Sequence, residues 1–287
     1  MKISLIVATY GRNNELRNLL RSIASQDYKN FEVIIIDQNQ DDRVHKILQD
    51  IGFTSHSVTV VKQKSKNLSE ARNRGMREAS GEIVFFPDDD CQLPENFFST
   101  VVQKFNEHEE MDFLSVPVLD PATNEVYTAA QGCEVITKRN ARTLTTGSGI
   151  LFRRQVAEKL QNFDPCLGLG GEFESSEDLD FVLRALYAGY KGYYYPRTFV
   201  IHEDPLKAYN KLTAQRAYRY NRGFGALVKK HLKVFGNRHL LLVFICECLK
   251  NFSNMVVHWP MNPARAEYNY LSLIGKIEGF FKYRSSR

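Results

Sequence analysis

The sequence predicts an α/β fold in which a mostly parallel sheet is flanked by helices. Its first hundred residues alternate short apolar segments with helical patterns at a spacing of 10–15 residues, which is typical of parallel strands joined by helical crossovers. The apolar segments are continuous rather than alternating, as in strands that are buried on both faces. Polar and acidic residues follow these segments, where such sheets bind their ligands.

The first half of the chain supplies four strands and three helices. Strands are expected at residues 2–10, 31–37, 57–61 and 83–86. A helical pattern follows Gly11, a short helix opens at 41–42 and ends near Gly52, and a third helix runs from Asn67 to Ala79. Asn67 stands three residues before Glu70, an N-terminal capping signature.

The second half is less regular. A helix is expected from Pro94 to about His108, then strands at 113–119, 134–138 and 150–152, and a short helix at 155–160. A glycine-rich loop at 166–171 precedes a helix that Ser175 or Ser176 is placed to cap. A final strand is expected at 193–201, and two or three basic, aromatic-rich helices after Pro205.

Composition indicates a globular protein in a reducing compartment. The 287 residues include five scattered cysteines without a CxxC pair. Met1 and Lys2 lead directly into a strand pattern, so no secretory signal is expected. The longest apolar stretch, residues 239–259, includes Glu247 and Lys250, and a transmembrane span is not expected there.

Charge is distributed unevenly along the chain. Residues 205–287 hold 8 Lys and 7 Arg against 3 Glu, a net charge of +12, whereas residues 1–204 carry −7. This asymmetry predicts a polyanionic partner or an anionic membrane surface for the C-terminal region.

The most informative stretch is the acidic triplet Asp88–Asp90, which follows the fourth strand. Adjacent carboxylates repel one another unless a cation or hydrogen-bond donors neutralise them, and a divalent ion held together with substrate phosphates does so. The alternative is an acidic turn that caps the helix after Pro94. Thr9, Tyr10 and Asp37 end two other strands, which favours a nucleotide site, although GxGxxG and GxxxxGK[ST] are absent.

Six motifs in order give a more specific indication: ATYGR, VIIIDQNQDD, NLSEARNRGMREASGEIVFFPDDD, GSGILFRR, FDPCLGLGGEFESSEDLDFVLRALYAGY and YYYPRTFVIHED. Over residues 1–204 this order resembles family 2 glycosyltransferases with the GT-A fold, above all bacterial enzymes of capsule, O-antigen or wall-polysaccharide synthesis. The resemblance implies inverting transfer of a hexose from a nucleotide sugar, most often a UDP-sugar, with Mn²⁺ or Mg²⁺. It implies a catalytic domain at 1–204, with a nucleotide-binding half at 1–110 and an acceptor-binding half at 111–204, and a helical region at 205–287.

The resemblance also implies the nucleotide contacts. Thr9 and Tyr10 correspond to residues that contact the nucleoside, and Asp37 to one that accepts a hydrogen bond from the base. Arg72 corresponds to an arginine near the base or diphosphate, and Asp88 to the first acid of Asp-x-Asp, on the ribose side. A surface ion pair of Arg72 within its helix is the structural alternative.

Asp90 corresponds to the metal-binding acid of Asp-x-Asp, and Asp89 fills its variable middle position. His202 corresponds to an additional metal ligand in some members; alternatively it pairs with Glu203 and Asp204.

The transfer step needs a base for the acceptor hydroxyl. By motif position this base is Asp178, with Glu177 orienting the acceptor, although the two roles could be exchanged. The glycine-rich segment Gly147, Ser148 and Gly149 is a candidate for the acceptor or phosphate side, or else a bulge in the chain.

The C-terminal region leaves three alternatives. It could bind anionic lipid or an acceptor on a polyprenyl diphosphate, or form a helical subdomain that packs on the catalytic core or makes a homodimer. A third alternative, nucleic-acid binding, is disfavoured because the sequence contains no RNA- or DNA-binding module. We expect a cytoplasmic enzyme on the inner face of the cell membrane. Two rival functions remain: a non-catalytic sugar- or nucleotide-binding module of the same fold, and a nucleotidyl or sugar-phosphate transferase.

Overall fold

A computed structural model describes residues 1–53, 57–126, 132–203 and 208–284. It divides the chain into two compact units, which are described separately. The first holds residues 1–163 and 181–203, and the second holds residues 164–180 together with the described residues after 204. The domain boundary that the sequence predicts between residues 204 and 205 lies outside the described residues and stays a prediction.

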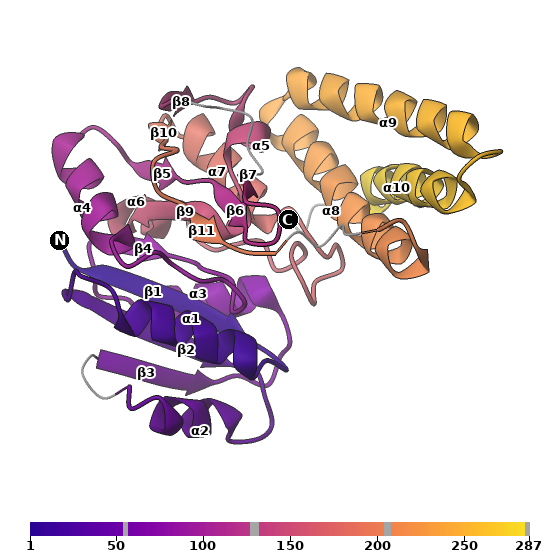
Figure 1. The fold of residues 1–287 in the computed structure, drawn as a ribbon. Coiled ribbons are helices and arrows are strands. Elements are labelled where there is room, and N and C mark those ends of the chain that lie inside the picture. The colour runs from indigo at the N-terminus through magenta and orange to yellow at the C-terminus, as the bar shows by residue number, and fades with distance from the viewer. Residues whose placement is uncertain (54–56, 127–131, 204–207, 285–287) are drawn as a thin grey trace. The chain divides into compact units, whose positions relative to one another are not determined.

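The first unit contains every strand of the described residues. They are β1 (Ile3–Thr9), β2 (Phe31–Asp37), β3 (Ser57–Lys62), β4 (Ile83–Phe85), β5 (Phe113–Ser115), β6 (Val118–Asp120), β7 (Glu125–Val126), β8 (Glu134–Ile136), β9 (Ile150–Arg153), β10 (Gly192–Tyr194) and β11 (Val200–Ile201). Figure 1 shows them with their helices: α1 (Asn14–Ala24), α2 (Arg43–Asp50), α3 (Leu68–Glu78), α4 (Phe97–Glu107), α5 (Ala141–Leu144), the 3₁₀ turn η1 (Gly147–Gly149), α6 (Arg154–Lys159) and α7 (Glu177–Tyr187), whose first turn belongs to the second unit.

The main sheet has eight strands in the order β3-β2-β1-β4-β9-β5-β10-β8. Strands β1 to β4 are parallel, β9 runs antiparallel to both of its neighbours, and β10 is parallel to β5. A second sheet pairs β11, β6 and β7. The predicted mostly parallel α/β fold is thus confirmed.

Helices cover both faces of the parallel strands. Leu16, Leu19, Leu20 and Ile23 recur at helical spacing and form one buried stripe of α1, which joins the core with side chains of α2, α4 and one face of β1 and β2. On the other face α3 approaches so closely that a Cβ on Gly75 would lie 2.2 Å from Ile6 Cγ2. Each buried Leu or Ile contributes about 1.5 to 3 kcal/mol by leaving water.

Two predicted strands are each divided by a proline. The segment 113–119 forms β5 and β6 in different sheets, with Pro117 between them, and the segment 193–201 forms β10 and β11, with Pro196 between them. Proline has no N–H to donate to a ladder, so the chain leaves one sheet there and joins the other. The predictions of continuous strands were wrong at these two points.

The second unit is built from three long helices, α8 (Lys211–Phe235), α9 (Arg238–His258) and α10 (Pro263–Lys282). Asparagines at positions 210, 237 and 262 cap their N-termini through side-chain oxygens. Glycines allow α8 and α10 to touch through their backbones: a Cβ on Gly225 would lie 2.1 Å from Lys276 O, and one on Gly279 would lie 2.0 Å from Arg222 O.

Helix α9 covers the apolar stretch in which no transmembrane span was expected. Among the described residues it alone is long and apolar enough to cross a membrane, with a mean hydropathy of 1.6 over an 18-residue window of which 11% is buried. Length and composition do not by themselves establish a span, and the polar residues noted in the sequence lie within this helix.

Candidate active site

The acidic triplet forms a tight turn at the carboxyl end of β4. Cys91 N donates to Asp88 O at 3.2 Å, which closes the turn, and Gln92 then pairs with Ile201 through two backbone hydrogen bonds of 2.9 Å. Because His202 follows Ile201 directly, this pairing places His202 beside the turn. The backbone N–H of His202 also donates to Leu119 O at 3.0 Å, so two neighbouring segments hold its position.

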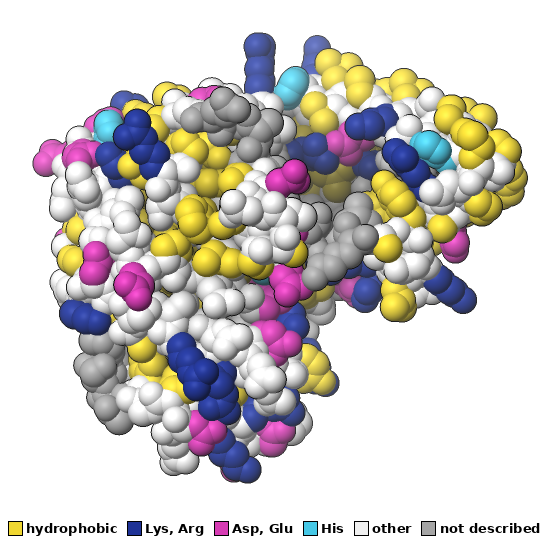
Figure 2. All heavy atoms as spheres, viewed as in Figure 1, with side chains coloured by type: hydrophobic (Ala, Val, Ile, Leu, Met, Phe, Trp, Pro, Cys, Tyr) yellow, Lys and Arg dark blue, Asp and Glu magenta, His cyan; other side chains and the backbone are white. Residues whose placement is uncertain are grey.

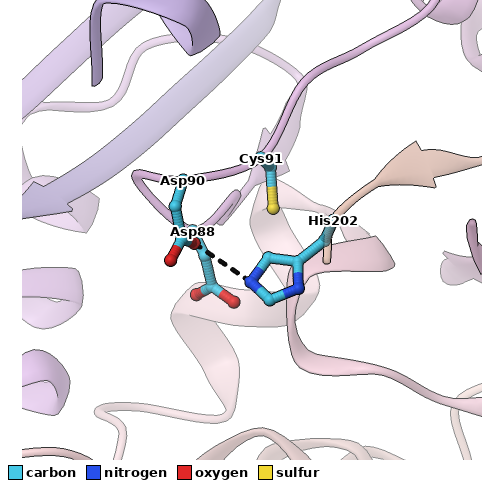
Figure 3. Close-up of side chains that lie close together, drawn as sticks. All are labelled: Asp88, Asp90, Cys91 and His202. Carbon is cyan, nitrogen blue, oxygen red and sulfur yellow. Dashed lines mark hydrogen bonds and ion pairs between the residues drawn. The ribbon is translucent and has the colours of Figure 1, made fainter. Parts of the chain in front are cut away.

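His202 therefore meets Asp90. Its Nε2 lies 3.1 Å from Asp90 Oδ1, and Figure 3 shows this contact with Asp88 beside it. One ligand atom from each of Asp88, Asp90, Cys91 and His202 lies within 4.8 Å of the others. The three residues assigned to the nucleotide and metal are thus brought together.

Electrostatics in this cluster are unbalanced. Burial raises the pKa of Asp89 to about 7, and the neighbouring carboxylates add to the rise. Burial opposes ionisation of Asp90 as well, yet the hydrogen bond and charge of His202, together with Arg12, hold the pKa of Asp90 below its ordinary value. The hydrogen bond to Asp90 in turn raises the pKa of His202. The turn thus requires additional positive charge to keep all its acids ionised.

Arg12 supplies part of that charge. Its Nη2 lies 2.5 Å from Asp90 Oδ2 and its Nε lies 3.4 Å from Asp89 Oδ1. Sequence reasoning quoted Arg12 within ATYGR and gave it no role; its signal was its position directly after a strand-end motif. Asp89 is turned toward this arginine, which agrees with its assignment outside the metal ligands.

The donor set fits a hard divalent ion. Two carboxylates and a neutral imidazole suit Mn²⁺ or Mg²⁺, which keep further positions for water or phosphate oxygens. Cys91 was interpreted as a packing residue, and its burial in the core raises the pKa of its thiol well above the ordinary value. A protonated thiol is a poor ligand, so Asp88, Asp90 and His202 are the residues placed to hold the ion.

A second group of polar residues ends β1 and β2. Thr9 lies opposite Asp37 in the parallel register, and both are fully buried. Asp37 Oδ1 accepts from the backbone N–H and the side chain of Asn39 at 2.9 and 2.8 Å, and its Oδ2 forms an ion pair with Lys62 at 2.8 Å. Sequence reasoning missed Lys62, which lies opposite Asp37 in the β2–β3 register.

Buried acceptors remain at this edge of the sheet. Gln38 Oε1 accepts no hydrogen bond from the described residues, and the partner of Asp37 Oδ2 is the Lys62 ammonium of the ion pair. A buried acceptor without a hydrogen-bond donor lowers the stability of the folded protein by about 1 to 3 kcal/mol. A ligand that presents N–H groups, such as a pyrimidine base, would satisfy them.

Arg72 and Tyr10 stand on either side of this edge. Arg72 is 2% exposed, its Nη2 lies 3.2 Å from Asp88 Oδ1, and its guanidinium lies over the ring of Phe163. It is therefore not the surface ion pair that was its alternative. Tyr10 is half exposed and is covered by Lys66, whose Nζ lies 4.2 Å from the ring centroid.

The segment Gly147–Gly149 forms the turn η1 before β9. A Cβ on Gly149 would lie 2.3 Å from Val116 O, so close backbone packing explains this glycine. Ser148 is buried. Assignment of the segment to an acceptor or phosphate stays a prediction.

Glu177 and Asp178 open α7, and Glu177 is buried while Asp178 is half buried. Ser176, just before them, has φ +71°, a left-handed conformation that is uncommon for serine. The Ser175 hydroxyl donates to Tyr220 O of α8 at 2.6 Å. A Cβ on Gly223 would lie 2.1 Å from Ser175 Oγ, so α8 is shaped to receive this segment.

Charged groups of α8 also hold the first turn of α7. Lys230 Nζ lies 2.8 Å from both Asp180 Oδ1 and Asp164 Oδ2, and His231 Nε2 lies 3.0 Å from the same Asp180 oxygen. Asp180 and His231 are fully buried. The segment that carries the predicted base is thus built into the second unit, which sequence reasoning did not anticipate.

Comparison with known proteins supports the fold and the family. The family model described as Glycosyl transferase family 2 matches residues 4–161, and that of Glycosyl transferase family group 2 matches residues 83–266. A glycosyltransferase of Haemophilus influenzae is 32% identical over 190 residues, which cover 64% of this chain and 62% of that protein. The GalNAc(5)-diNAcBac-PP-undecaprenol beta-1,3-glucosyltransferase of Campylobacter jejuni is 33% identical over 108 residues, 37% of this chain and 35% of that protein. The chain thus spans less than two thirds of either relative.

Solved structures show the same fold at low identity. S. aureus TarS 1–349 in complex with UDP-GlcNAc matches with a TM-score of 0.61 at 16% identity, over 100% of this chain and 93% of that one. The mannosyltransferase PcManGT of Pyrobaculum calidifontis, in complex with GDP-Man and Mn²⁺, matches with a TM-score of 0.63 at 15% identity, over 96% and 86%. The chain belongs to glycosyl transferase family 2 and has the GT-A fold.

Proposed function

We propose that this chain transfers a hexose from a UDP-sugar to a hydroxyl of a lipid-linked saccharide, with inversion, during synthesis of a bacterial surface polysaccharide such as capsule, O-antigen or wall polymer. The observation that carries the proposal is the meeting of Asp88, Asp90 and His202 at the strand edge that also ends in Asp37. This edge joins a candidate metal site to the buried Asp37 carboxylate and to the buried Gln38 Oε1, which has no hydrogen-bond partner among the described residues.

The nucleotide contacts follow from the residues described. Asp37 Oδ2 is the acceptor for the N3–H of uracil, with Thr9 and Tyr10 beside the nucleoside. Arg72 lies within reach of Asp88, so its charge is available to the diphosphate. The UDP-GlcNAc complex of TarS supports a UDP-sugar as donor, since that neighbour shares the fold.

Asp88, Asp90 and His202 would hold Mn²⁺ or Mg²⁺, which supplies charge stabilisation for the departing diphosphate. The Mn²⁺ complex of PcManGT supports this choice of ion. Arg12 positions the Asp90 carboxylate through its ion pair.

The transfer step is a single in-line displacement. As the acceptor oxygen bonds to the anomeric carbon, the bond from that carbon to the diphosphate oxygen breaks, and the acceptor proton passes to a carboxylate. We assign that base to Asp178, which is more accessible than the buried Glu177, and Glu177 to orienting the acceptor. The domain assignment, with catalysis in residues 1–204 and an acceptor-binding half at 111–204, is part of the proposal.

A lipid-linked acceptor places the enzyme at the inner face of the cell membrane. The Campylobacter relative, named for an undecaprenol-linked substrate, supports a polyprenyl-diphosphate acceptor. Figure 2 shows hydrophobic and basic side chains gathered over the C-terminal helices, which supports a lipid-facing role for them.

The test is nucleotide release by the purified full chain from a panel of UDP-, GDP- and dTDP-sugars, with a polyprenyl-diphosphate saccharide as acceptor. We expect UDP to be released from UDP-sugars, EDTA to abolish this release, and Mn²⁺ or Mg²⁺ to restore it. The Asp90→Asn variant should lose the release, whereas the control variant Asp112→Asn should retain it. Release that is no faster with metal and acceptor than without them, or none from any sugar, would overturn the proposal in favour of a non-catalytic module. Acceptor-dependent release that EDTA does not affect would overturn the metal-assisted mechanism. Release of UMP in place of UDP would indicate a sugar-phosphate transferase, and formation of UTP that depends on added pyrophosphate would indicate a nucleotidyl transferase.

A further inference from the structure

Helix α9 presents a broad apolar face to its surroundings. Along it the exposed large side chains recur at spacings of three and four residues, and several are more than half exposed. They are Leu242 (60%), Ile245 (44%), Leu249 (64%), Phe252 (54%), Val256 (53%), Val257 (53%) and, just past the helix, Trp259 (67%) and Met261 (74%). Figure 2 shows this face as a yellow band along the helix. Contiguous exposed apolar surface of this kind marks a binding surface.

The opposite side of α9 is apolar near its start, where Leu240 and Phe244 are buried and Phe244 stacks on Phe280 of α10, and polar farther along. Asn251 accepts from Lys276 Nζ of α10 at 2.7 Å and donates to Asn269 Oδ1 at 3.0 Å. Lys276 is 4% exposed and also lies 3.4 Å from Glu247 Oε2. A helix of a water-soluble bundle buries its apolar side and exposes its polar side. In the second half of α9 polar groups lie inside and large apolar groups outside, which suits apolar surroundings.

Two kinds of partner could cover such a face: a second copy of the chain or a lipid surface. At 3.6 residues per turn the exposed apolar positions of α9, from Leu242 to Val257, span about 140° of the helix circumference. A helix–helix seam needs only a narrow stripe. Exposed apolar side chains also continue onto the other helices, with Leu212 on α8 at 77% and Phe281 on α10 at 76%. The breadth of the surface favours lipid.

Charge favours the same partner. Residues 208–284 contain thirteen Lys and Arg against three Glu, a formal net charge of +10. Two copies brought face to face would repel, whereas a bilayer with anionic head groups attracts this unit. Trp259, at the end of the face, is of the type that favours the interface between water and lipid.

We propose that the outward face of α9 inserts into the boundary between head groups and acyl chains of an anionic membrane, with the helix lying in the membrane plane. Glu247, Lys250, Asn251 and Asn254 keep the polar side of the helix against α10 and water. The inference deepens the proposed function, on which its purpose rests, by naming the surface that meets the lipid of a lipid-linked acceptor.

The test is flotation of the purified full chain with vesicles of phosphatidylglycerol and phosphatidylethanolamine, with phosphatidylcholine vesicles in parallel. We expect binding to the anionic vesicles, at least tenfold weaker binding to phosphatidylcholine, and release by carbonate at high pH. The double variant Leu249→Glu/Phe252→Glu should lose at least tenfold of the binding. Val135→Glu, which alters a comparably exposed apolar side chain of β8 (55%), should keep it.

Three outcomes would overturn the inference. Wild-type protein that does not float, and is a dimer that the double variant dissociates, would assign the face to a second copy. Binding that resists carbonate would indicate a spanning helix. Equal flotation of wild type and double variant with a matched thermal midpoint would place the lipid contact elsewhere. Nucleotide release is measured separately, so its failure would refute the proposed function while leaving the vesicle result to stand.

Discussion

His202 Nε2 lies 3.1 Å from Asp90 Oδ1, although 112 residues separate them in the chain. The contact depends on one short pairing, in which Ile201 and Gln92 exchange two backbone hydrogen bonds. It joins the turn after β4 to the segment that follows β11. The candidate metal site is therefore built from two segments of the first unit that lie far apart in the sequence.

This contact predicts how metal binding depends on pH. The hydrogen bond to Asp90 raises the pKa of His202. Protonated His202 therefore stabilises the folded, metal-free protein at pH values below the ordinary histidine pKa, and this contribution to stability is lost as the pH rises through the raised pKa. A metal must displace this proton, so Mn²⁺ affinity should increase as pH rises through this range. Calorimetric titration with Mn²⁺ between pH 6 and 8.5 measures the slope. His202→Gln should flatten it, and an unchanged slope would remove His202 from the site.

The base assignment predicts a separation of binding from chemistry. Asp178→Asn should lower kcat by roughly 10²- to 10⁴-fold, the usual contribution of a general base, and leave the Kd for UDP within about twofold. Glu177→Gln should instead raise KM for the acceptor. The comparison uses the same donor and acceptor for both variants. If Asp178→Asn stays active and Glu177→Gln does not, the two roles are exchanged.

The ion pairs of α8 predict that the C-terminal helices support catalysis. Lys230→Met removes the cation that bridges Asp164 and the buried Asp180, and should cost roughly 1 to 4 kcal/mol of unfolding free energy. Transfer should fall more than UDP binding, because the affected segment carries Asp178 and no nucleotide contact. Denaturant unfolding and UDP titration measure the two effects. The exposed Lys233→Met is the control, and equal behaviour of the two variants would contradict the role of Lys230.

Glu32 predicts a separate pH effect on stability. Burial opposes its ionisation, but hydrogen bonds from Lys2, Ser4 and Ser80 outweigh it and lower the pKa of Glu32 to about 2. The contribution of ionised Glu32 to the free energy of unfolding is present above the ordinary glutamate pKa and is lost as the pH falls toward 2. Glu32→Gln should therefore destabilise by about 1 to 3 kcal/mol at pH 7, with the difference shrinking below pH 4. Urea unfolding against the exposed Glu78→Gln checks this, and a difference that persists at pH 2.5 would refute it.

The sequence alone was sufficient to predict the parallel strands of the first half of the chain. Continuous apolar runs such as Phe31–Asp37 fill a strand buried on both faces, and the structure places all seven of these residues in the interior. The acids at the strand ends were predictable for the same reason, because parallel strands end at one edge. Asp37, Asp88 and Asp90 follow from this rule alone.

The remainder depends on contacts that no local pattern records. Arg12 and Lys62 gained their roles only when the sheet register brought them to Asp90 and Asp37. Pro117 and Pro196 were visible in the sequence, yet the sheet that each following segment would join was not. The exposed apolar face of α9 was not predicted, because the polar residues within this helix indicated that it would not contact lipid. The structure shows that Asn251 of α9 hydrogen-bonds to side chains of α10.

The most direct test of the account is UDP affinity with and without Mn²⁺, in wild type and in Asp90→Asn. The account predicts that wild-type protein binds UDP at least tenfold more tightly with saturating Mn²⁺ than with EDTA, a difference of about 1.4 kcal/mol or more. Asp90→Asn should bind UDP with the same weak affinity in both conditions. An Asp90→Asn protein that keeps the full gain from Mn²⁺ would contradict the assignment of the metal to this turn.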